Sequence, residues 1–199
     1  GGPNNIRRTV DEYVQADVAA IHLEDQVAPK RCGQRAGIEL VDAHTSARRL
    51  QAAVAARGER DLLIIGRTDG LPGVGEKEAI NRANRYLDAG VDLVFVDGIK
   101  TVAEVEAVAR DVAGPKVVSI VDGNETELLS SSDLHELGFS VVLYAVTTLF
   151  AATHAISTAL ARLHDDGTPA NIRPRHSYEA FSAIVDLDRY ADFDETYSS

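Results

Sequence analysis

The amino-acid sequence predicts an α/β protein of the (β/α)8 TIM-barrel type, in which about five β/α units are present. Short apolar runs typical of buried strands alternate with helical segments along most of the 199 residues. Polar or charged residues also follow these runs repeatedly. A parallel sheet covered by helices gives this alternation, and in a barrel the residues after the strands face the open mouth. A doubly wound open sheet is the alternative architecture, because it too places ligands at the ends of its strands.

The first half of the chain predicts two helices and two strands. Residues 5–16 carry apolar side chains at helical spacing, and the apolar run 18–23 follows as a buried strand. Residues 46–57 are rich in alanine and arginine and form the next helix. The apolar run 61–66 forms the second strand.

The middle of the chain repeats this order. Residues 76–89 form a helix that ends at Gly90, a residue that commonly terminates helices. The third strand is predicted over 91–96 and the next helix over 102–113. Residues 116–121 make the fourth strand.

The last units are a short helix over 132–137, a strand over 141–146 and a long helix over 149–164. A closed barrel has eight strands, so we expect the N-terminal units to be supplied by upstream sequence or by a partner. We divide the chain into a partial barrel domain, 1–167, and a C-terminal extension, 168–199. The extension should comprise a connector, a helix over 177–190 and an acidic tail, with the helix packing on a neighbouring subunit.

Composition excludes several classes of partner. The net charge of −11 argues against a nucleic-acid or anionic-membrane surface. Apolar residues make up 45% of the chain, as in globular proteins, but we find no run long enough to span a bilayer. A single cysteine excludes an internal disulfide and fits the reducing cytoplasm.

The segment 21–33, IHLEDQVAPKRCG, carries the most chemistry. An apolar run ends in two acids, beginning with Glu24, and a loop then delivers Lys30, Arg31 and Cys32. The two cations favour the reactive thiolate at Cys32. A lone cysteine is otherwise a small buried hydrophobe, Glu24 an exposed strand end or a salt-bridge partner, and Lys30 an ordinary surface lysine.

Three motifs together resemble the isocitrate lyase/phosphoenolpyruvate mutase superfamily. They are IHLEDQVAPKRCG, the later GRTDG and AINRANRYLDAGVDLVFVDG. The PKRCG loop is similar to that of the carbon–carbon lyase branch, which includes methylisocitrate lyase, isocitrate lyase and alkylmalate lyases. The opening GGPNNIRRTV resembles the segment just after the family's metal-binding Asp-x-Asp-x-Gly stretch. On this alignment the main aspartate ligands lie upstream of Gly1.

The resemblance implies a catalytic role for three residues. Cys32 would be the acid/base that exchanges a proton with the substrate carbon, and Lys30 would help to hold a substrate carboxylate. Arg67 would bind a carboxylate through its planar guanidinium group. The alternative for Arg67 is a structural ion pair with Asp69 or Asp97.

The resemblance also implies metal and substrate contacts. Glu24 would lie near Mg²⁺ and its waters, with Mn²⁺ as an alternative ion. Substrate contacts are implied for Gly33, Gln34, Asp97 and Ser119. Three positions depart from the lyase pattern and point to an altered substrate or to reduced activity: Gln34 replaces the usual histidine, Asp97 the usual glutamate, and the segment 119–122 an asparagine-containing stretch.

The implied function is a Mg²⁺-dependent lyase that cleaves a carbon–carbon bond in a 2-hydroxy di- or tricarboxylate, such as a methylisocitrate- or alkylmalate-like acid. The products are a 2-oxo acid and a second carboxylate. Alternatives are an oxaloacetate hydrolase or decarboxylase, a phosphonate-type enzyme of the superfamily, or a degenerate, non-catalytic subunit. The resemblance further implies a cytoplasmic homotetramer, built as a dimer of dimers with exchanged C-terminal helices.

Overall fold

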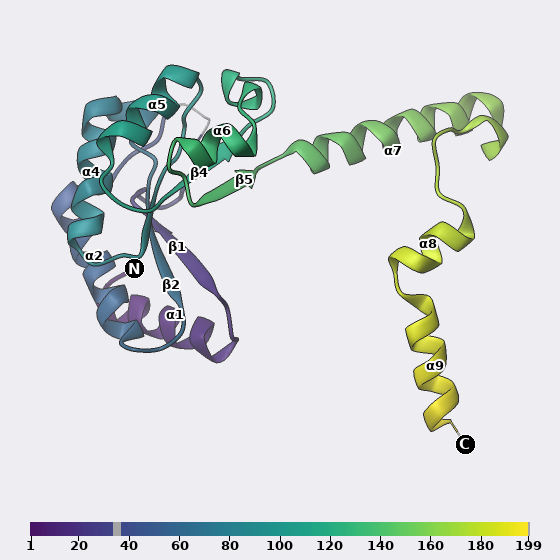
Figure 1. Ribbon diagram of the computed structural model, residues 1–199, viewed down its shortest axis with the longest axis horizontal. Coiled ribbons are helices and arrows are strands. Elements are labelled where there is room, and N and C mark those ends of the chain that lie inside the picture. The colour runs from purple at the N-terminus through teal and green to yellow at the C-terminus, as the bar shows by residue number, and fades with distance from the viewer. Residues whose placement is uncertain (34–36, 199) are drawn as a thin grey trace. The chain divides into compact units, whose positions relative to one another are not determined.

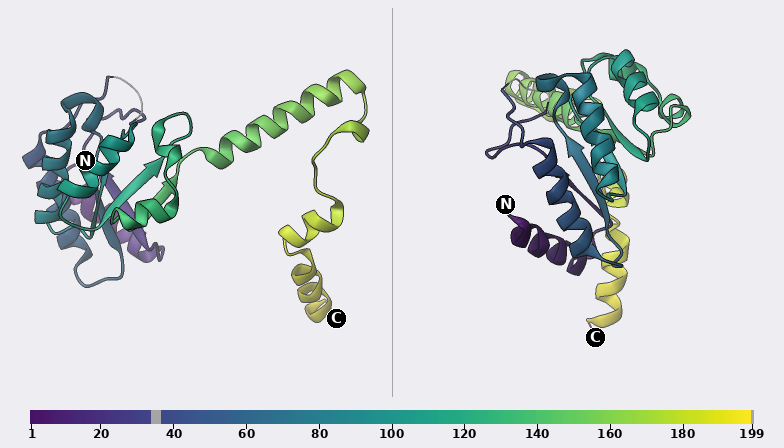
Figure 2. Two further views of the ribbon diagram at one scale, coloured as in Figure 1. Left: turned by 45° about the horizontal axis from the view of Figure 1, so that its top comes forward. Right: turned by 90° about the vertical axis from the view of Figure 1, so that its left-hand side faces the viewer.

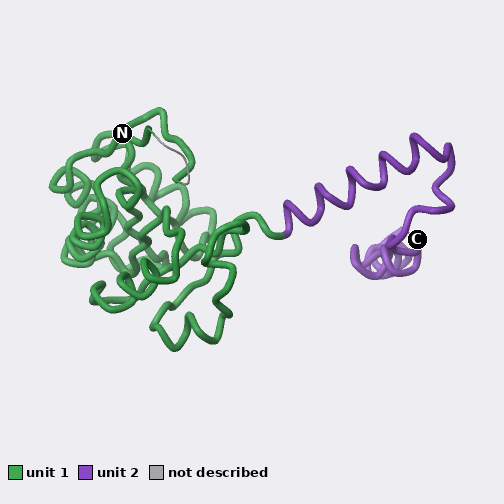
Figure 3. The backbone as a smooth tube through the Cα atoms, turned by 90° about the horizontal axis from the view of Figure 1, so that it is seen from above, with its two compact units in different colours: residues 1–147 green, residues 148–199 purple. Residues whose placement is uncertain are grey.

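The structure is a computed structural model that describes residues 1–33 and 37–198. It comprises two compact units, residues 1–147 and residues 148–199 (Figure 3). The sequence placed a boundary after residue 167, whereas the contacts divide the chain at the start of the long helix α7. The described helices include none long and apolar enough to cross a membrane.

The first unit is built on one parallel sheet whose strand order follows the sequence, β1-β2-β3-β4-β5 (Figure 1). The strands are β1 Ala20–Glu24, β2 Leu63–Thr68, β3 Leu93–Val96, β4 Lys116–Ile120 and β5 Val141–Tyr144. A doubly wound sheet reverses its strand order at a switch point, and this sheet does not. The five strands form a curled half-barrel, so the predicted incomplete barrel is confirmed.

Helices lie along one face of this sheet, as Figure 1 and Figure 2 show. Helices α2 and α4 contact the strands directly, while α1 packs on α2 and α5 on α4. The helices of this unit are α1 Pro3–Gln15, α2 Ala43–Arg57, α3 Leu71–Val74, α4 Glu76–Asp88, α5 Val102–Asp111 and α6 Ser131–Glu136, with a 3₁₀ turn, η1, at Glu125–Leu128.

The strands alternate between a helix-covered face and a concave inner face. Side chains such as Ile64, Val94 and Val118 point to the helices and are almost fully buried. Residues of the opposite parity line the inner face, where Leu63 is 45% and Leu143 38% exposed. Alternate residues therefore build the core, and the others face the barrel interior.

Local capping explains where several of these helices begin. The side chain of Asp42 accepts a hydrogen bond from the Thr45 amide and caps α2. Thr101 and Glu104 form a reciprocal capping box at the start of α5, which satisfies backbone donors that the helix itself leaves free. Gly90, with φ of 92°, follows α4 in the left-handed region that glycine adopts freely.

The second unit consists of most of α7 Thr147–Asp166, the 3₁₀ turn η2 Pro169–Asn171, and the helices α8 Tyr178–Ile184 and α9 Leu187–Tyr197. The single helix predicted over 177–190 is therefore two helices, separated at Asp186, whose φ of 53° is left-handed.

The acidic tail expected near the C-terminus is also wrong, because α9 runs through it. Aromatic residues recur there at helical spacing, and the rings of Phe193 and Tyr197 lie 4.8 Å apart. This pairing stabilises a helix that the acidic residues alone do not predict.

Candidate active site

The loop after β1 is closed at its base by backbone pairing. Gln26 and Leu40 form an antiparallel bridge. The amide of Val27 donates to the carbonyl of Glu39 at 2.8 Å, and the amide of Val41 donates to the carbonyl of Asp25 at 2.8 Å. These bonds bring both ends of the loop to the carboxyl end of the sheet, where they position the PKRCG motif.

Asp25 is a buried structural hub beneath this loop. Its carboxylate accepts hydrogen bonds from the Thr68 hydroxyl at 2.7 Å, the Tyr86 hydroxyl at 2.7 Å and the Asp69 amide at 3.0 Å. Arg82 completes the set with an ion pair at 3.0 Å. Burial, together with the Asp25 charge, raises the pKa of Tyr86 well above its usual value. Asp25 therefore fixes the end of β2, whereas the other predicted acid, Glu24, contacts Lys30 and Arg67.

Gln26 links the loop to the end of β2. Its side-chain NH₂ donates to Asp69 Oδ2 at 2.6 Å and to the carbonyl of Arg31 at 2.8 Å. Its side-chain oxygen accepts the Arg31 amide at 2.8 Å. The backbone between Lys30 and Cys32 is thereby held against Asp69.

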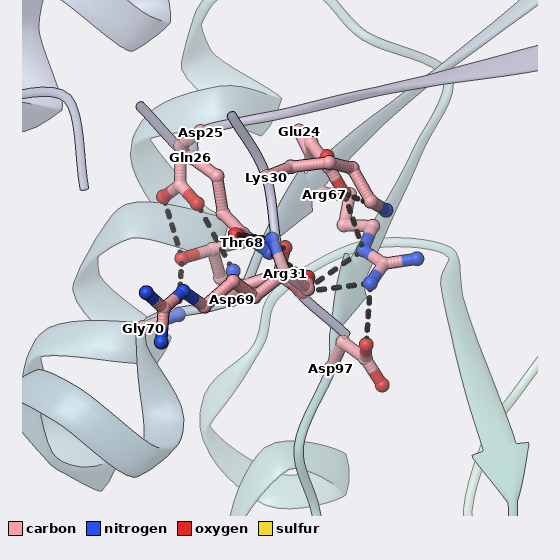
Figure 4. A network of polar contacts seen from close by, with 10 residues as sticks. All are labelled: Glu24, Asp25, Gln26, Lys30, Arg31, Arg67, Thr68, Asp69, Gly70 and Asp97. Atoms are coloured by element: carbon pink, nitrogen blue, oxygen red, sulfur yellow. Dashed lines mark hydrogen bonds and ion pairs between the residues drawn. The ribbon is translucent and has the colours of Figure 1, made fainter. Parts of the chain in front are cut away.

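Arg67 is the centre of the charged cluster shown in Figure 4. Its guanidinium pairs with Asp69 at 2.9 Å and with Asp97 at 2.5 Å, and it lies 3.5 Å from Glu24. The guanidinium lies over the ring of Phe95, with its central carbon 5.1 Å from the ring centroid. The sequence offered a structural ion pair with Asp69 or Asp97 as the alternative to substrate binding by Arg67, and both pairs are present. They orient the guanidinium at the mouth of the half-barrel.

Two of the carboxylates around Arg67, those of Asp97 and Glu24, have raised pKa values. Burial raises the pKa of Asp97, and the nearby Asp69 raises it further although Arg67 opposes the shift. Burial also raises the pKa of Glu24, despite its hydrogen bond from Lys30 Nζ at 3.0 Å. Three carboxylates share two cations here, and burial is the main cause of both raised pKa values, with the charge of Asp69 adding to it.

One hollow of about 730 Å³ brings most of the predicted site residues together. The residues of the predicted site that line this hollow are Lys30, Cys32, Gly33, Arg67, Asp97 and Ser119. Cys32 is exposed rather than buried among apolar side chains. The predicted Gln34 lies outside the described residues. Chain segments far apart in sequence thus converge on one cavity at the carboxyl ends of the strands.

Gly33 is a close-packed part of this hollow. A Cβ added at Gly33 would overlap Asp97 Oδ2 and lie 3.0 Å from Asp69 Oδ1. Only glycine allows the loop backbone to approach these two carboxylates so closely. Steric crowding by these carboxylates therefore explains why glycine occupies the last position of the Lys-Arg-Cys-Gly motif.

Among the residues that the structure describes, one carboxylate beside Arg67 could contribute an oxygen ligand to a metal ion. No group of three His, Cys, Asp or Glu side chains among residues 1–33 and 37–198 is placed to hold a metal ion. Glu24 does not line the hollow of Lys30 and Cys32 but a neighbouring pocket that shares Arg67 with it. Its carboxylate is 19% exposed and is of the kind that binds a hard cation such as Mg²⁺. It can supply one oxygen donor, directly or through water.

The structure also shows contributors that the sequence patterns did not single out for the site. Gln26 and Asp69 position the loop, and Phe95 supports Arg67. Val121 and Leu143 line the hollow from β4 and β5. The positions of Leu143 within one predicted strand and of Val121 at the end of another were the available signals.

The fold and the site define a class: a parallel (β/α) half-barrel with an arginine, a lysine and a thiol around a hollow at the carboxyl ends of its strands. The sequence profile of the phosphoenolpyruvate phosphomutase family matches residues 1–164. The chain belongs to this family, within the phosphoenolpyruvate mutase/isocitrate lyase superfamily.

Individual relatives include named lyases. The chain is 31% identical over 200 residues to 2,3-dimethylmalate lyase of Eubacterium barkeri, covering 100% of this chain and 69% of that protein. It is 37% identical over 194 residues to probable 2-methylisocitrate lyase 1 of Corynebacterium glutamicum, covering 97% and 63%. A crystal structure of 2,3-dimethylmalate lyase superposes with a TM-score of 0.87 at 34% identity, covering 98% of this chain and 66% of that one. The chain thus spans about two thirds of the length of these relatives.

Proposed function

We propose that the protein is a carbon–carbon lyase that cleaves a small 2-hydroxy dicarboxylate or tricarboxylate into a 2-oxo acid and a second carboxylate. The observation that carries this proposal is the convergence of Lys30, Cys32 and Arg67 on one hollow at the strand ends. Cations that can hold carboxylates and an exposed thiol that can move a proton are the groups this reaction needs.

Arg67 and Lys30 would hold the substrate carboxylates at the rim. Asp69 and Asp97 fix the plane of the Arg67 guanidinium, which can then present a free edge to a carboxylate. As the carbon–carbon bond breaks, the substrate hydroxyl gives its proton to solvent, which later reprotonates the thiolate, and its oxygen becomes the carbonyl oxygen of the 2-oxo acid. The electron pair remains on the departing carbon, and the thiol of Cys32 gives that carbon a proton. Reprotonation of the thiolate then restores the site without net gain or loss of protons.

A divalent cation, Mg²⁺ or in its place Mn²⁺, belongs to this proposal. In the cluster around Arg67 the carboxylates of Glu24, Asp97 and the buried Asp69 outnumber the cations Lys30 and Arg67, so an anionic substrate approaches an excess of negative charge. A bound cation would offset this charge and polarise the substrate oxygens. Glu24 is the donor that this chain would supply.

A substrate panel tests the proposed function on the natural full-length protein. We expect release of pyruvate or glyoxylate from at least one of 2,3-dimethylmalate, 2-methylisocitrate and isocitrate. EDTA should abolish that release and added Mg²⁺ should restore it, because the excess negative charge at the rim would again be offset. Turnover of oxaloacetate or phosphonopyruvate alone would instead place the protein in another branch of the superfamily. Silence on the whole panel would indicate a non-catalytic subunit.

We also propose a homo-oligomer, a dimer of dimers in which the C-terminal helices pack on a neighbouring copy. None of the described residues 148–198 is buried within its own unit. Large apolar side chains are exposed along these helices, among them Leu149, Phe150, Leu160, Phe181, Tyr190 and Phe193. An apolar surface of this extent needs a partner. Light scattering of the full-length protein should give a tetrameric mass, and a monomer at micromolar concentration would contradict the proposal.

The same proposal places the protein in the cytoplasm. Cys32 is a free, exposed thiol, and a reducing compartment keeps such a thiol available for proton transfer.

A further inference from the structure

The second unit contains a hollow of its own, with a volume of about 400 Å³, between α7 and the connector that follows η2. Three polar side chains of α7 line it, those of His154, Thr158 and Arg162. Residues four apart lie on the same face of a helix, so these side chains form one stripe along α7. Ala155 and Ala159 also line the hollow, and their small side chains leave room for a ligand.

The connector forms the other wall of this hollow. The side-chain amide of Asn171 donates to Asp166 Oδ2 at 3.1 Å, which ties the connector to the end of α7. The guanidinium of Arg175 donates to the carbonyl of Pro169 at 3.1 Å. These two bonds shape the turn after α7, and the turn brings Arg173 to the hollow.

The hollow carries positive charge. Among the described residues that line it are the guanidinium groups of Arg162 and Arg173, and no carboxylate. Neither arginine forms an ion pair with any residue that the structure describes; within this unit the arginine that does is Arg189, 4.0 Å from Asp186. A protein with a net charge of −11 therefore places together two guanidinium groups that no described acid neutralises. The planar fork of a guanidinium matches the oxygens of a carboxylate or a phosphate.

The polar stripe lies away from the apolar face of α7. Leu160 falls midway in sequence between Thr158 and Arg162, about 160° around the helix from each at 3.6 residues per turn. Other exposed aliphatic side chains of the helix share the side of Leu160, namely Leu149, Ile156 and Leu163. A neighbouring copy that packs on this apolar side would leave the stripe open to a ligand.

We propose that this hollow is a binding site for a small dianion, whose carboxylate or phosphate oxygens accept hydrogen bonds from Arg162 and Arg173. The hydroxyl of Thr158 supplies a further donor on the same wall. The described linings of this hollow and of the hollow around Arg67 share no residue. Binding in the C-terminal hollow therefore does not require the proposed lyase reaction.

Calorimetry on the full-length protein at low salt tests the site with two probes, inorganic phosphate and succinate. We expect at least one of them to bind, and the tighter of the two identifies the site as a phosphate or a dicarboxylate site. Arg162→Ala and Arg173→Ala should each weaken this binding about tenfold or more, because each removes charge-assisted hydrogen bonds to the anion. A probe bound at Arg67 would be unaffected by these two substitutions.

Arg162→Lys separates charge from geometry. Lysine keeps the positive charge but not the planar fork, so this variant should bind more weakly than the wild type and more tightly than Arg162→Ala. Arg162 and Arg173 are both exposed, so we expect the variants to fold as the wild type does, with an unchanged Tm.

Arg189→Ala is the matched control. Arg189 belongs to the same unit and loses the same charge, but it does not line the hollow. This variant should bind both probes as the wild type does. The site would be overturned by a wild type that binds neither probe, or by an affinity that is unchanged in Arg162→Ala or in Arg173→Ala. Equal weakening in Arg189→Ala would also overturn it, since the effect would then come from net charge alone.

Discussion

Replacing Cys32 with serine is expected to lower kcat of the proposed lyase reaction by about 10²–10⁴-fold, the range for losing a general acid. A serine hydroxyl is a far weaker acid than a thiol and gives up its proton poorly to the departing carbon. Because Cys32 is exposed, the substitution removes little packing, and the free energy of unfolding should hardly change. Steady-state kinetics and thermal unfolding of the same preparations would measure both effects.

A second measurement separates proton transfer from binding. In D₂O, the wild type should exchange the carbon-bound proton of the product that receives it, and Cys32→Ser should not. Val27→Ala provides the control, because Val27 lies on the same loop with an exposed side chain outside the hollow. Wild-type turnover in Cys32→Ser would show that another group moves the proton.

Asp25→Asn should be the most destabilising substitution in this region, with a loss of about 3–5 kcal/mol in the free energy of unfolding. Asp25 is 2% exposed and accepts from Thr68, Tyr86 and the Asp69 amide besides pairing with Arg82. An amide removes the buried partner of the Arg82 guanidinium, which keeps only its ion pair with the more exposed Glu78. It also places an NH₂ group among donors.

Asp11→Asn is the matched comparison for urea denaturation. Asp11 pairs with Arg60 at 2.8 Å, but each side chain is 40% exposed. Exposed pairs contribute under about 1 kcal/mol, so this variant should unfold close to the wild type. Equal losses in the two variants would mean that the hub around Asp25 does not hold the end of β2 as the structure indicates.

Most of the barrel strands could be predicted from the sequence, because each is a short apolar run bounded by polar or turn-forming residues. All five predicted strands occur, displaced by at most two residues at either end. The order of the strands in the sheet could not be predicted, because strands and helices alternate along the chain both in a barrel and in a doubly wound sheet. The C-terminal region was harder: one left-handed residue, Asp186, divides the predicted helix, and ring pairing between Phe193 and Tyr197 extends helix into the expected tail.

For the site, the residues after the strands were the informative signal, and one hollow is lined by Lys30, Cys32, Arg67 and Ser119, whereas Glu24 lies outside its lining. The hydrogen-bond and ion-pair partners of the site residues could not be predicted from the sequence. Whether Arg67 binds Asp69, Asp97 or a ligand depends on how three strands converge. The contact between Gln26 and Asp69 likewise joins residues 43 positions apart.

The alternation of side chains across the sheet has an evolutionary consequence. Along β2, Ile64 packs into the core, whereas Arg67 points into the hollow; on β4, Val118 and Ser119 divide in the same way. Substitutions at the inward positions can therefore change which acid is accepted while leaving the helix-facing packing intact. Descendants of such a chain can explore new substrates one residue at a time, each from a separate β/α unit, without first becoming less stable.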